Sequence, residues 1–233
     1  MSAPDPLRPT GRGISWPGWT LATAIGSTIG AVVGGALITT WLQPFGGVSS
    51  PLEAALIAIP RTAGALGVWG AGIGILQALL LRRHLAGALW WPIATASGWA
   101  VAGAVSGALP VTGAVTGRGV DIGPLGYGAV AVVTVVAIGL LSGFFQWLIL
   151  RQHVRRSGWW VWASAGGIAL AILVAAVILA VIQAVGWLRP EDFPSAQSFG
   201  VAGVSVGLIY GAVSGQALIK VLRLLAAQRG GDG

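Results

Sequence analysis

The sequence predicts an all-α membrane protein with six transmembrane helices, arranged as three parallel two-helix repeats. Of its 233 residues, 55% are hydrophobic and only 8% are charged, whereas about a quarter of a soluble domain is charged. Several apolar runs reach about 20 residues, enough to cross ~30 Å of hydrocarbon at ~1.5 Å per residue. Finally, the stretch GAGIGILQALLLRRH at 70–84 returns as GLLSGFFQWLILRQH at 139–153, with Gly, Gly, Gln, Leu, Arg and His at the same offsets.

Six spans are predicted, and the connections between them alternate in length. The spans are placed at 19–41, 62–82, 90–109, 128–150, 160–183 and 199–219. The connections at 83–89 and 151–159 are short and basic, while those at 42–61, 110–127 and 184–198 are longer and rich in Pro and Gly. This alternation is typical of helical hairpins in series. The apolar segment 51–60 is too short to cross a bilayer, and we predict that it is interfacial or re-entrant.

The repeat divides the chain into three hairpin units that form one membrane domain. The units are placed at 16–86, 87–156 and 157–228, between cytoplasmic tails at 1–15 and 229–233. Each first helix begins with a tryptophan and a similar small-residue motif, at Trp19, Trp91 and Trp160. Because each unit holds two spans, all three share one orientation. The third unit is degenerate: it has Gln216 but no Arg-x-His tail, so its register is open by two residues.

The charge distribution predicts the orientation in the membrane. The net charge is +7, and most basic residues fall in the tails and the short connections. The positive-inside rule then predicts that both termini lie on the cytoplasmic side of a bacterial inner membrane. We also expect the tryptophans at 16, 19, 90, 91, 159 and 160 to mark that interface. Since the charges sit at helix ends rather than in one patch, nucleic acid is not an expected partner.

Glycines recur at intervals of four residues along several predicted spans. Residues four apart lie on one helix face, so these positions predict grooves where another backbone approaches closely. Two interpretations are open: packing within the chain, or an oligomer or partner interface, above all on the last span. The helix-packing glycines are Gly26, Gly30, Gly34, Gly70, Gly74, Gly139, Gly143, Gly203, Gly207, Gly211 and Gly215.

Two glutamines are predicted to form an interhelical polar clamp. Gln77 and Gln146 each follow a glycine by seven residues and therefore share its face. A side-chain amide in hydrocarbon needs a partner, and an interhelical hydrogen bond there is worth ~0.6–2 kcal/mol. The expected partners occupy equivalent positions on the first helices, namely Thr23, Thr95 and Ser164. In the alternative interpretation, the amides line a polar path or hold a ligand.

A repeated Arg-x-His pattern ends two of the predicted spans, at Arg82 and His84 and again at Arg151 and His153. We expect these side chains to contact anionic phospholipid headgroups at the rim of the bilayer. An alternative is imidazole ligation of haem or a chlorin, but both histidines sit at the rim and no third ligand type accompanies them. No cofactor and no metal site is otherwise expected.

The motifs do not predict an enzyme. The Ala-x-Ser-Gly motif at 104–107 and 212–215 is similar to the serine motif of rhomboid-type intramembrane proteases. That family needs Gly-x-Ser-Gly and a histidine within a later span, and without a base neither serine is activated. The three-hairpin plan is also similar to that of mitochondrial carriers, but their Pro-x-Asp/Glu-x-x-Lys/Arg signature is missing. The lack of an ionisable residue near the midplane counts against coupled transport.

One resemblance covers nearly the whole chain. The run GLLSGFFQWLILRQHVRRSGWW at 139–160 resembles the repeated hairpin of small, uncharacterised bacterial multi-pass membrane proteins, with GxxxGxxQWxxLR followed by a Trp pair. The resemblance implies fold and location and brings no activity. We expect a packing or accessory subunit that associates through its glycine-lined faces, as a homo-oligomer or with a membrane-protein partner. The alternatives are a channel or facilitator for a small neutral solute through the six-helix centre, and a haem- or chlorin-binding subunit.

Overall fold

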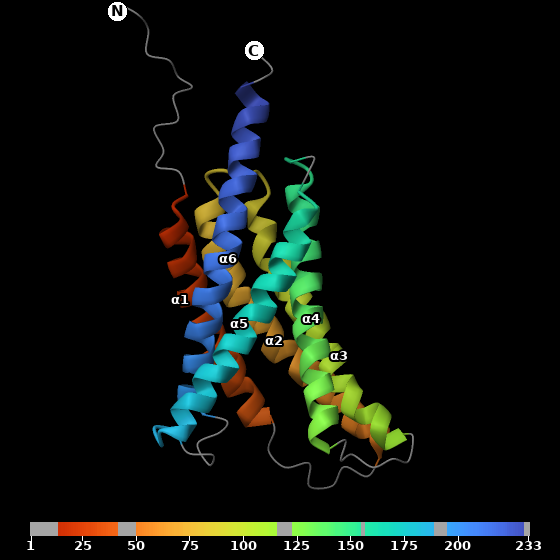
Figure 1. The fold of residues 1–233 in the computed structure, drawn as a ribbon. Helices are drawn as coiled ribbons and strands as arrows, with labels where there is room; N and C mark the ends of the chain where they lie inside the picture. The colour runs from red at the N-terminus through yellow and green to blue at the C-terminus, as the bar shows by residue number, and fades with distance from the viewer. Residues whose placement is uncertain (1–13, 42–49, 116–122, 155–156, 189–194, 231–233) are drawn as a thin grey trace, which may run out of the picture.

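The computed structural model describes residues 14–41, 50–115, 123–154, 157–188 and 195–230. In this part of the chain the regular structure is entirely helical, with six α-helices and one short 3₁₀ helix. Predictions that fall on 1–13, 42–49, 116–122, 155–156, 189–194 and 231–233 lie outside the described residues. The elements are α1 (Trp16–Trp41), α2 (Pro51–Leu81), η1 (Ala88–Trp90), α3 (Trp91–Val115), α4 (Gly123–Leu150), α5 (Trp159–Ala184) and α6 (Ala196–Gly230) (Figure 1).

Five of the helices are long and apolar enough to cross a membrane. The qualifying segments are Trp16–Thr40, Ala55–Leu81, Ala129–Leu150, Trp159–Ala184 and Ala196–Leu224. The remaining long helix, α3, has 25 residues. The predicted class, an all-α chain with the composition of a multi-pass membrane protein, is therefore confirmed at this level.

The six helices pack in a closed ring. Each long helix packs against the next one in the sequence, and α6 returns to pack against α1. Figure 1 shows the helices gathered toward the end where α1 begins and α4 ends, while α4 and α5 diverge toward the opposite end. The bundle is therefore tightest at one end and more open at the other.

Helix α2 begins earlier than the sequence predicts. The segment 51–60, expected to be interfacial or re-entrant, is the first part of α2, and this expectation is wrong. The Ser50 side chain caps the helix by accepting a hydrogen bond from the Glu53 backbone N–H, and Pro51 follows in the first turn, where a missing N–H costs nothing. Pro60 lies inside the helix. Apolar helices packed against neighbours tolerate such an interruption.

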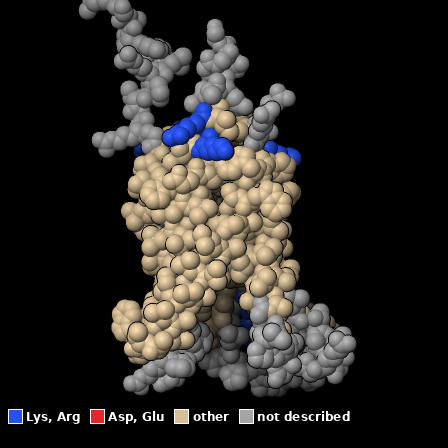
Figure 2. Space-filling view, viewed as in Figure 1, with Lys and Arg blue, Asp and Glu red and all other residues tan. Residues whose placement is uncertain are grey.

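Basic side chains gather at the end of the bundle where α1 begins and α4 ends, which we call the basic end. Figure 2 shows lysine and arginine side chains there above a flank of uncharged residues, and a further basic side chain is visible between the helices near the opposite end. Two of them rest on aromatic rings: Arg151 over Trp147 and Lys220 over Trp159, each at 5.3 Å from the ring centroid. The turn after α2 closes through Gly87, whose φ of 79° favours a residue without a Cβ.

Candidate functional site

Three tryptophans fill the core of the bundle near its basic end. Trp19, Trp91 and Trp160 are fully buried. The rings of Trp19 and Trp91 meet edge to face at 6.5 Å, and those of Trp91 and Trp160 at 5.8 Å. These three rings therefore face the core of the bundle rather than lipid, whereas the neighbouring Trp90 is 64% exposed. Each of the three indole N–H groups donates a hydrogen bond to a side chain inside the bundle.

Gln77 joins three helices through its side-chain amide. Its Nε2 donates to Thr23 Oγ1 on α1 at 3.1 Å, and its Oε1 accepts from Trp91 Nε1 on α3 at 2.9 Å. The structure thus brings together the glutamine and threonine singled out in the sequence. The tryptophan donor was missed. Its signal was the spacing of four residues between each unit's tryptophan and its hydroxyl residue, which places both on one helix face.

Gln146 repeats this arrangement one hairpin later. Its Nε2 donates to Thr95 Oγ1 on α3 at 2.9 Å, and its Oε1 accepts from Trp160 Nε1 on α5 at 2.9 Å. Both amides are fully buried with donor and acceptor satisfied, which is how a polar group becomes tolerable in an apolar core. Each glutamine therefore holds its own hairpin together and ties it to the next.

The third interface, between α6 and α1, uses a shorter residue. Trp19 Nε1 donates to Ser214 Oγ at 3.0 Å, so Ser214 takes the acceptor role of the two glutamines. Gln216 is exposed, and the acceptor lies two residues before it. Ser164, expected to join a clamp, makes no hydrogen bond of normal geometry with a described residue, and the Tyr210 side chain of α6 approaches its buried hydroxyl. Ser214 accepts a hydrogen bond from Trp19, but it has no amide N–H group like the one through which each glutamine donates a second hydrogen bond.

The glycines of the second helix in each hairpin pack against the first helix of the following hairpin. A Cβ on Gly74 would meet Pro92 and Thr95 of α3, and one on Gly143 would meet Val161 and Ser164 of α5. On α6, a Cβ on Gly207 would lie 2.5 Å from Ala24 Cα of α1. The close glycine contact that joins α2 to α3 and α4 to α5 therefore also joins α6 to α1.

The remaining predicted glycines also face helices of the same chain. Gly26, Gly30 and Gly34 approach backbone atoms of α2, and Gly203, Gly211 and Gly215 approach α1. Gly70 lies against the ring of Trp99, and Gly139 against Ala165. Of the two interpretations left open by the sequence, packing within the chain describes these positions. The α6 glycines are covered by α1 and offer no free face to a partner in this fold.

A hollow of about 330 Å³ at the basic end contains one copy of the Arg-x-His pattern. It is lined by Arg82, Arg83 and His84 from the end of α2, together with the first turn of α1. Ser15 caps that turn by accepting from the Gly18 N–H at 3.2 Å. Three basic side chains around one hollow form a site of suitable charge for an anionic group.

The second copy of the Arg-x-His pattern is engaged differently. Arg151 stacks over Trp147, and His153 Nδ1 lies 3.2 Å from the Ile149 backbone carbonyl. The structure therefore does not bring the two histidines to one shared site with a common hollow. Among the described residues, no group of three metal-ligating side chains is found.

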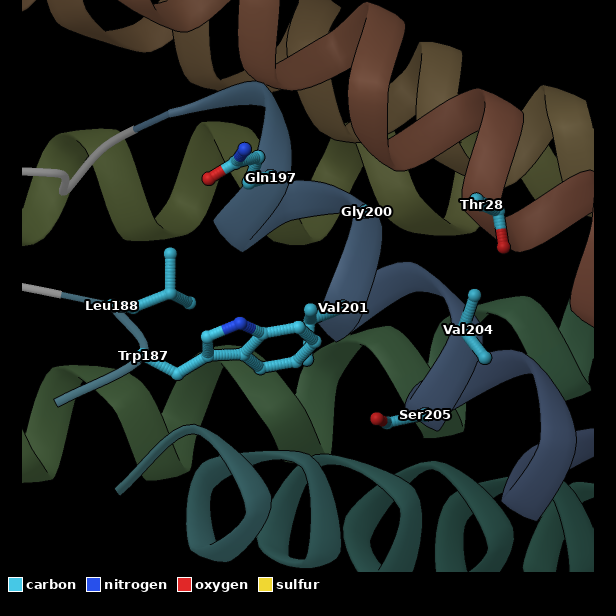
Figure 3. A pocket seen from close by; sticks show the side chains of 8 residues that line it. All are labelled: Thr28, Trp187, Leu188, Gln197, Gly200, Val201, Val204 and Ser205. Carbon is cyan, nitrogen blue, oxygen red and sulfur yellow. The ribbon is translucent and has the colours of Figure 1, made fainter. Parts of the chain in front are cut away.

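Two further hollows lie away from the basic end. One, of about 610 Å³, runs beside the start of α6. There the ring of Trp187 lies alongside Val201, and Thr28 of α1 also lines the hollow (Figure 3). The other, of about 490 Å³, lies at the bundle centre and is lined by side chains of α2, α3, α4, α5 and α6. Its lining is almost entirely aliphatic and aromatic.

No protein-family model matches this sequence, and no curated protein and no solved structure does so either. The resemblance to small bacterial multi-pass proteins therefore stays a prediction.

Proposed function

We propose that this chain is a non-catalytic accessory subunit of the bacterial cytoplasmic membrane, with α3 as its sixth span and both termini in the cytoplasm. The observation that carries the proposal is the internal use of its polar groups. Both buried amides and the indole donors of Trp19, Trp91 and Trp160 are spent on helix–helix contacts, which supports a rigid frame rather than a reactive centre. The basic end faces the cytoplasm by the positive-inside rule.

The frame consists of three parallel hairpin repeats in a ring. Support comes from equivalent contacts: a tryptophan donating to the second helix of the preceding hairpin recurs for Trp19, Trp91 and Trp160. Aligning Gly207, Gly211 and Ser214 with Gly139, Gly143 and Gln146 gives a spacing of 68 residues for the third unit. This register also places Leu218 opposite Leu150, and both are fully buried.

A partner, either another copy or a second membrane protein, docks on the outward face of α5. The glycine-lined faces expected to serve this role are covered inside the chain. On α5, by contrast, Gly166 has no atom within 4 Å of where its Cβ would be. Leu170, Leu173 and Val177 continue the exposed side at helical spacing. A helix can therefore approach closely at Gly166, which is the geometry that favours association in lipid.

Purification in a mild detergent followed by native mass spectrometry tests this role. We expect an oligomer or a stoichiometric partner with the wild-type chain. Gly166→Leu should release it while thermal stability stays unchanged, and Ala196→Leu, at an exposed position on α6, should leave the complex intact. A stable wild-type monomer without any partner would contradict the proposal.

The alternative function, a channel for a small neutral solute through the centre, has less support. The tryptophan layer and the fully buried Leu81, Leu150 and Leu218 occupy the bundle near the basic end. Solute would have to displace this core to pass. Liposome flux above that of empty vesicles, altered by Gln77→Leu with Gln146→Leu, would restore the channel as the better proposal.

The hollow at the basic end binds the headgroup of an anionic phospholipid. Its three basic side chains come from Arg82, Arg83 and His84, at a rim where cations meet lipid phosphates. Arg82→Gln with Arg83→Gln should reduce retention of phosphatidylglycerol during purification. Arg223→Gln, which removes a charge from an exposed α6 residue outside this hollow, is the matched control. Equal retention in both variants would exclude the site.

A further inference from the structure

The hollow of about 490 Å³, which we call the central cavity, is lined by five helices and is open at its rim. Trp69 of α2 and Trp99 of α3 lie at one part of its wall, with ring centroids 5.2 Å apart and planes tilted by 40°. Ala131 of α4 and Ala176 of α5 line it and are exposed. Its volume of about 490 Å³ lies within the range of ligand sites, roughly 300–1,000 Å³.

Among the described residues of the cavity wall, the indole N–H of Trp99 is a polar donor without a described partner. Ser106 donates to the Gly103 carbonyl at 3.0 Å, and Thr134 donates to the Val130 carbonyl at 2.7 Å. Trp69 Nε1 donates to Ser27 Oγ at 2.9 Å. Trp99 is 1% exposed, yet its indole N–H donates to no described residue. The indole nitrogen of Trp99 is not sealed inside the protein. The hollow that Trp99 lines is the central cavity.

The depth of this donor restricts the occupant. Trp99 lies eight residues along α3 from Trp91, about 12 Å at ~1.5 Å per residue, and sixteen residues, about 24 Å, from the other end of the helix. A phospholipid keeps its ester oxygens at the bilayer surface, so its buried tail brings no acceptor to this depth. The acceptor must arrive on a molecule that enters the hydrocarbon region whole.

We propose that the central cavity binds a neutral lipophilic ring compound that carries a carbonyl group. Its ring packs beside Trp69 and Trp99, and its carbonyl oxygen accepts from Trp99 Nε1. Val135, Ile172 and their aliphatic neighbours on the wall surround the rest of the molecule. Aromatic rings favour offset or tilted packing with a planar guest, and a buried donor gains most when its acceptor is supplied.

A short-tailed alkyl benzoquinone is a suitable probe, because quinones quench tryptophan fluorescence. The purified wild-type chain in nanodiscs should show a saturable quenching component above the linear one caused by partition into lipid. Trp99→Phe keeps the ring and removes the donor, so affinity should fall about three- to tenfold. Ala176→Phe fills the cavity from its rim and should abolish saturation. Ala169→Phe, at an exposed α5 position outside the wall, should behave as wild type.

Circular dichroism of each variant separates loss of binding from loss of fold. Quenching that is linear in the wild type, or equally saturable in Ala176→Phe and Ala169→Phe, would overturn the proposal. So would native mass spectra in which a phospholipid stays bound, is lost in Ala176→Phe, and is not displaced by the quinone. That last result would identify an acyl chain as the occupant.

Discussion

Replacing Gln146 with leucine tests whether the buried amides hold the bundle together. The side chains are similar in size, so packing changes little while both hydrogen bonds disappear. Trp160 Nε1 loses its acceptor and Thr95 Oγ1 loses its donor, at sites fully closed to solvent and lipid. The loss therefore comes from polar contacts rather than from a cavity.

The structure allows the size of this effect to be worked out. Interhelical hydrogen bonds in membranes contribute about 0.6–1.7 kcal/mol each, and two are lost. The indole donor left unpaired adds about 1 kcal/mol or more. Threonine still donates to the Trp91 carbonyl at 2.9 Å, so its hydroxyl stays satisfied. The expected cost is about 2–4 kcal/mol of unfolding free energy.

Reversible unfolding in mixed micelles, followed by tryptophan fluorescence, measures the difference. Gln216→Leu is the matched control, because the same substitution falls at an exposed position of α6 and should change stability by less than about 0.5 kcal/mol. If Gln146→Leu and Gln216→Leu were equally stable, the amide would not be holding α3, α4 and α5 together.

Four further substitutions test individual contacts of α5 and α6. Gly207→Leu should cost about 3 kcal/mol or more, because its side chain would enter the backbone of α1, whereas Gly166→Leu faces open space and should leave the unfolding midpoint unchanged. Ser214→Ala should cost about 1 kcal/mol, less than Gln146→Leu, because it removes one hydrogen bond, from the Trp19 indole, whereas Gln146→Leu removes two; the same unfolding assay ranks them. Ser164→Ala removes a buried hydroxyl that makes no hydrogen bond of normal geometry, although Tyr210 approaches it, so stability should change by less than about 1 kcal/mol; a larger loss would show that Ser164 and Tyr210 are hydrogen-bonded.

The sequence predicted the helical class and the two glutamine–threonine pairs because these depend on local spacing. Composition defines long apolar helices, and a fixed offset from glycine places an amide on the packed face. Gln77 and Thr23 could thus be matched across two helices by depth alone. The role of the α6 glycines as a seam with α1 was one of two open interpretations, since residue spacing does not reveal which helix covers a groove.

Other features depended on tertiary contacts that spacing does not encode. Tryptophans at helix starts usually mark an interface, and only the position of the acceptors draws Trp91 and Trp160 inward. The segment 51–60 is too short to cross a bilayer by itself, and its length does not reveal that α2 continues through Pro60. The central cavity lies where α4 and α5 diverge (Figure 1), and no sequence motif predicts this divergence.

Closure of the ring between α1 and α6 within one chain is tested most directly by a disulfide. The chain has no cysteine. A Cβ on Gly203 would lie 2.8 Å from Ala31 Cβ, 2.8 Å from Thr28 Cα and 2.9 Å from the Ser27 carbonyl oxygen. Disulfide Cβ atoms average about 3.8 Å apart, so a separation of α1 and α6 by about 1 Å both relieves these backbone contacts and accommodates the bond. Gly67→Cys with Ala100→Cys, across α2 and α3, is the positive control.

Oxidation of the Ala31→Cys, Gly203→Cys variant in native membranes, followed by non-reducing electrophoresis and peptide mass spectrometry, is the decisive measurement. A closed ring predicts a cross-linked monomer with one peptide joining α1 to α6. A cross-linked dimer, or no bond under conditions that link the Gly67→Cys, Ala100→Cys pair, would contradict it.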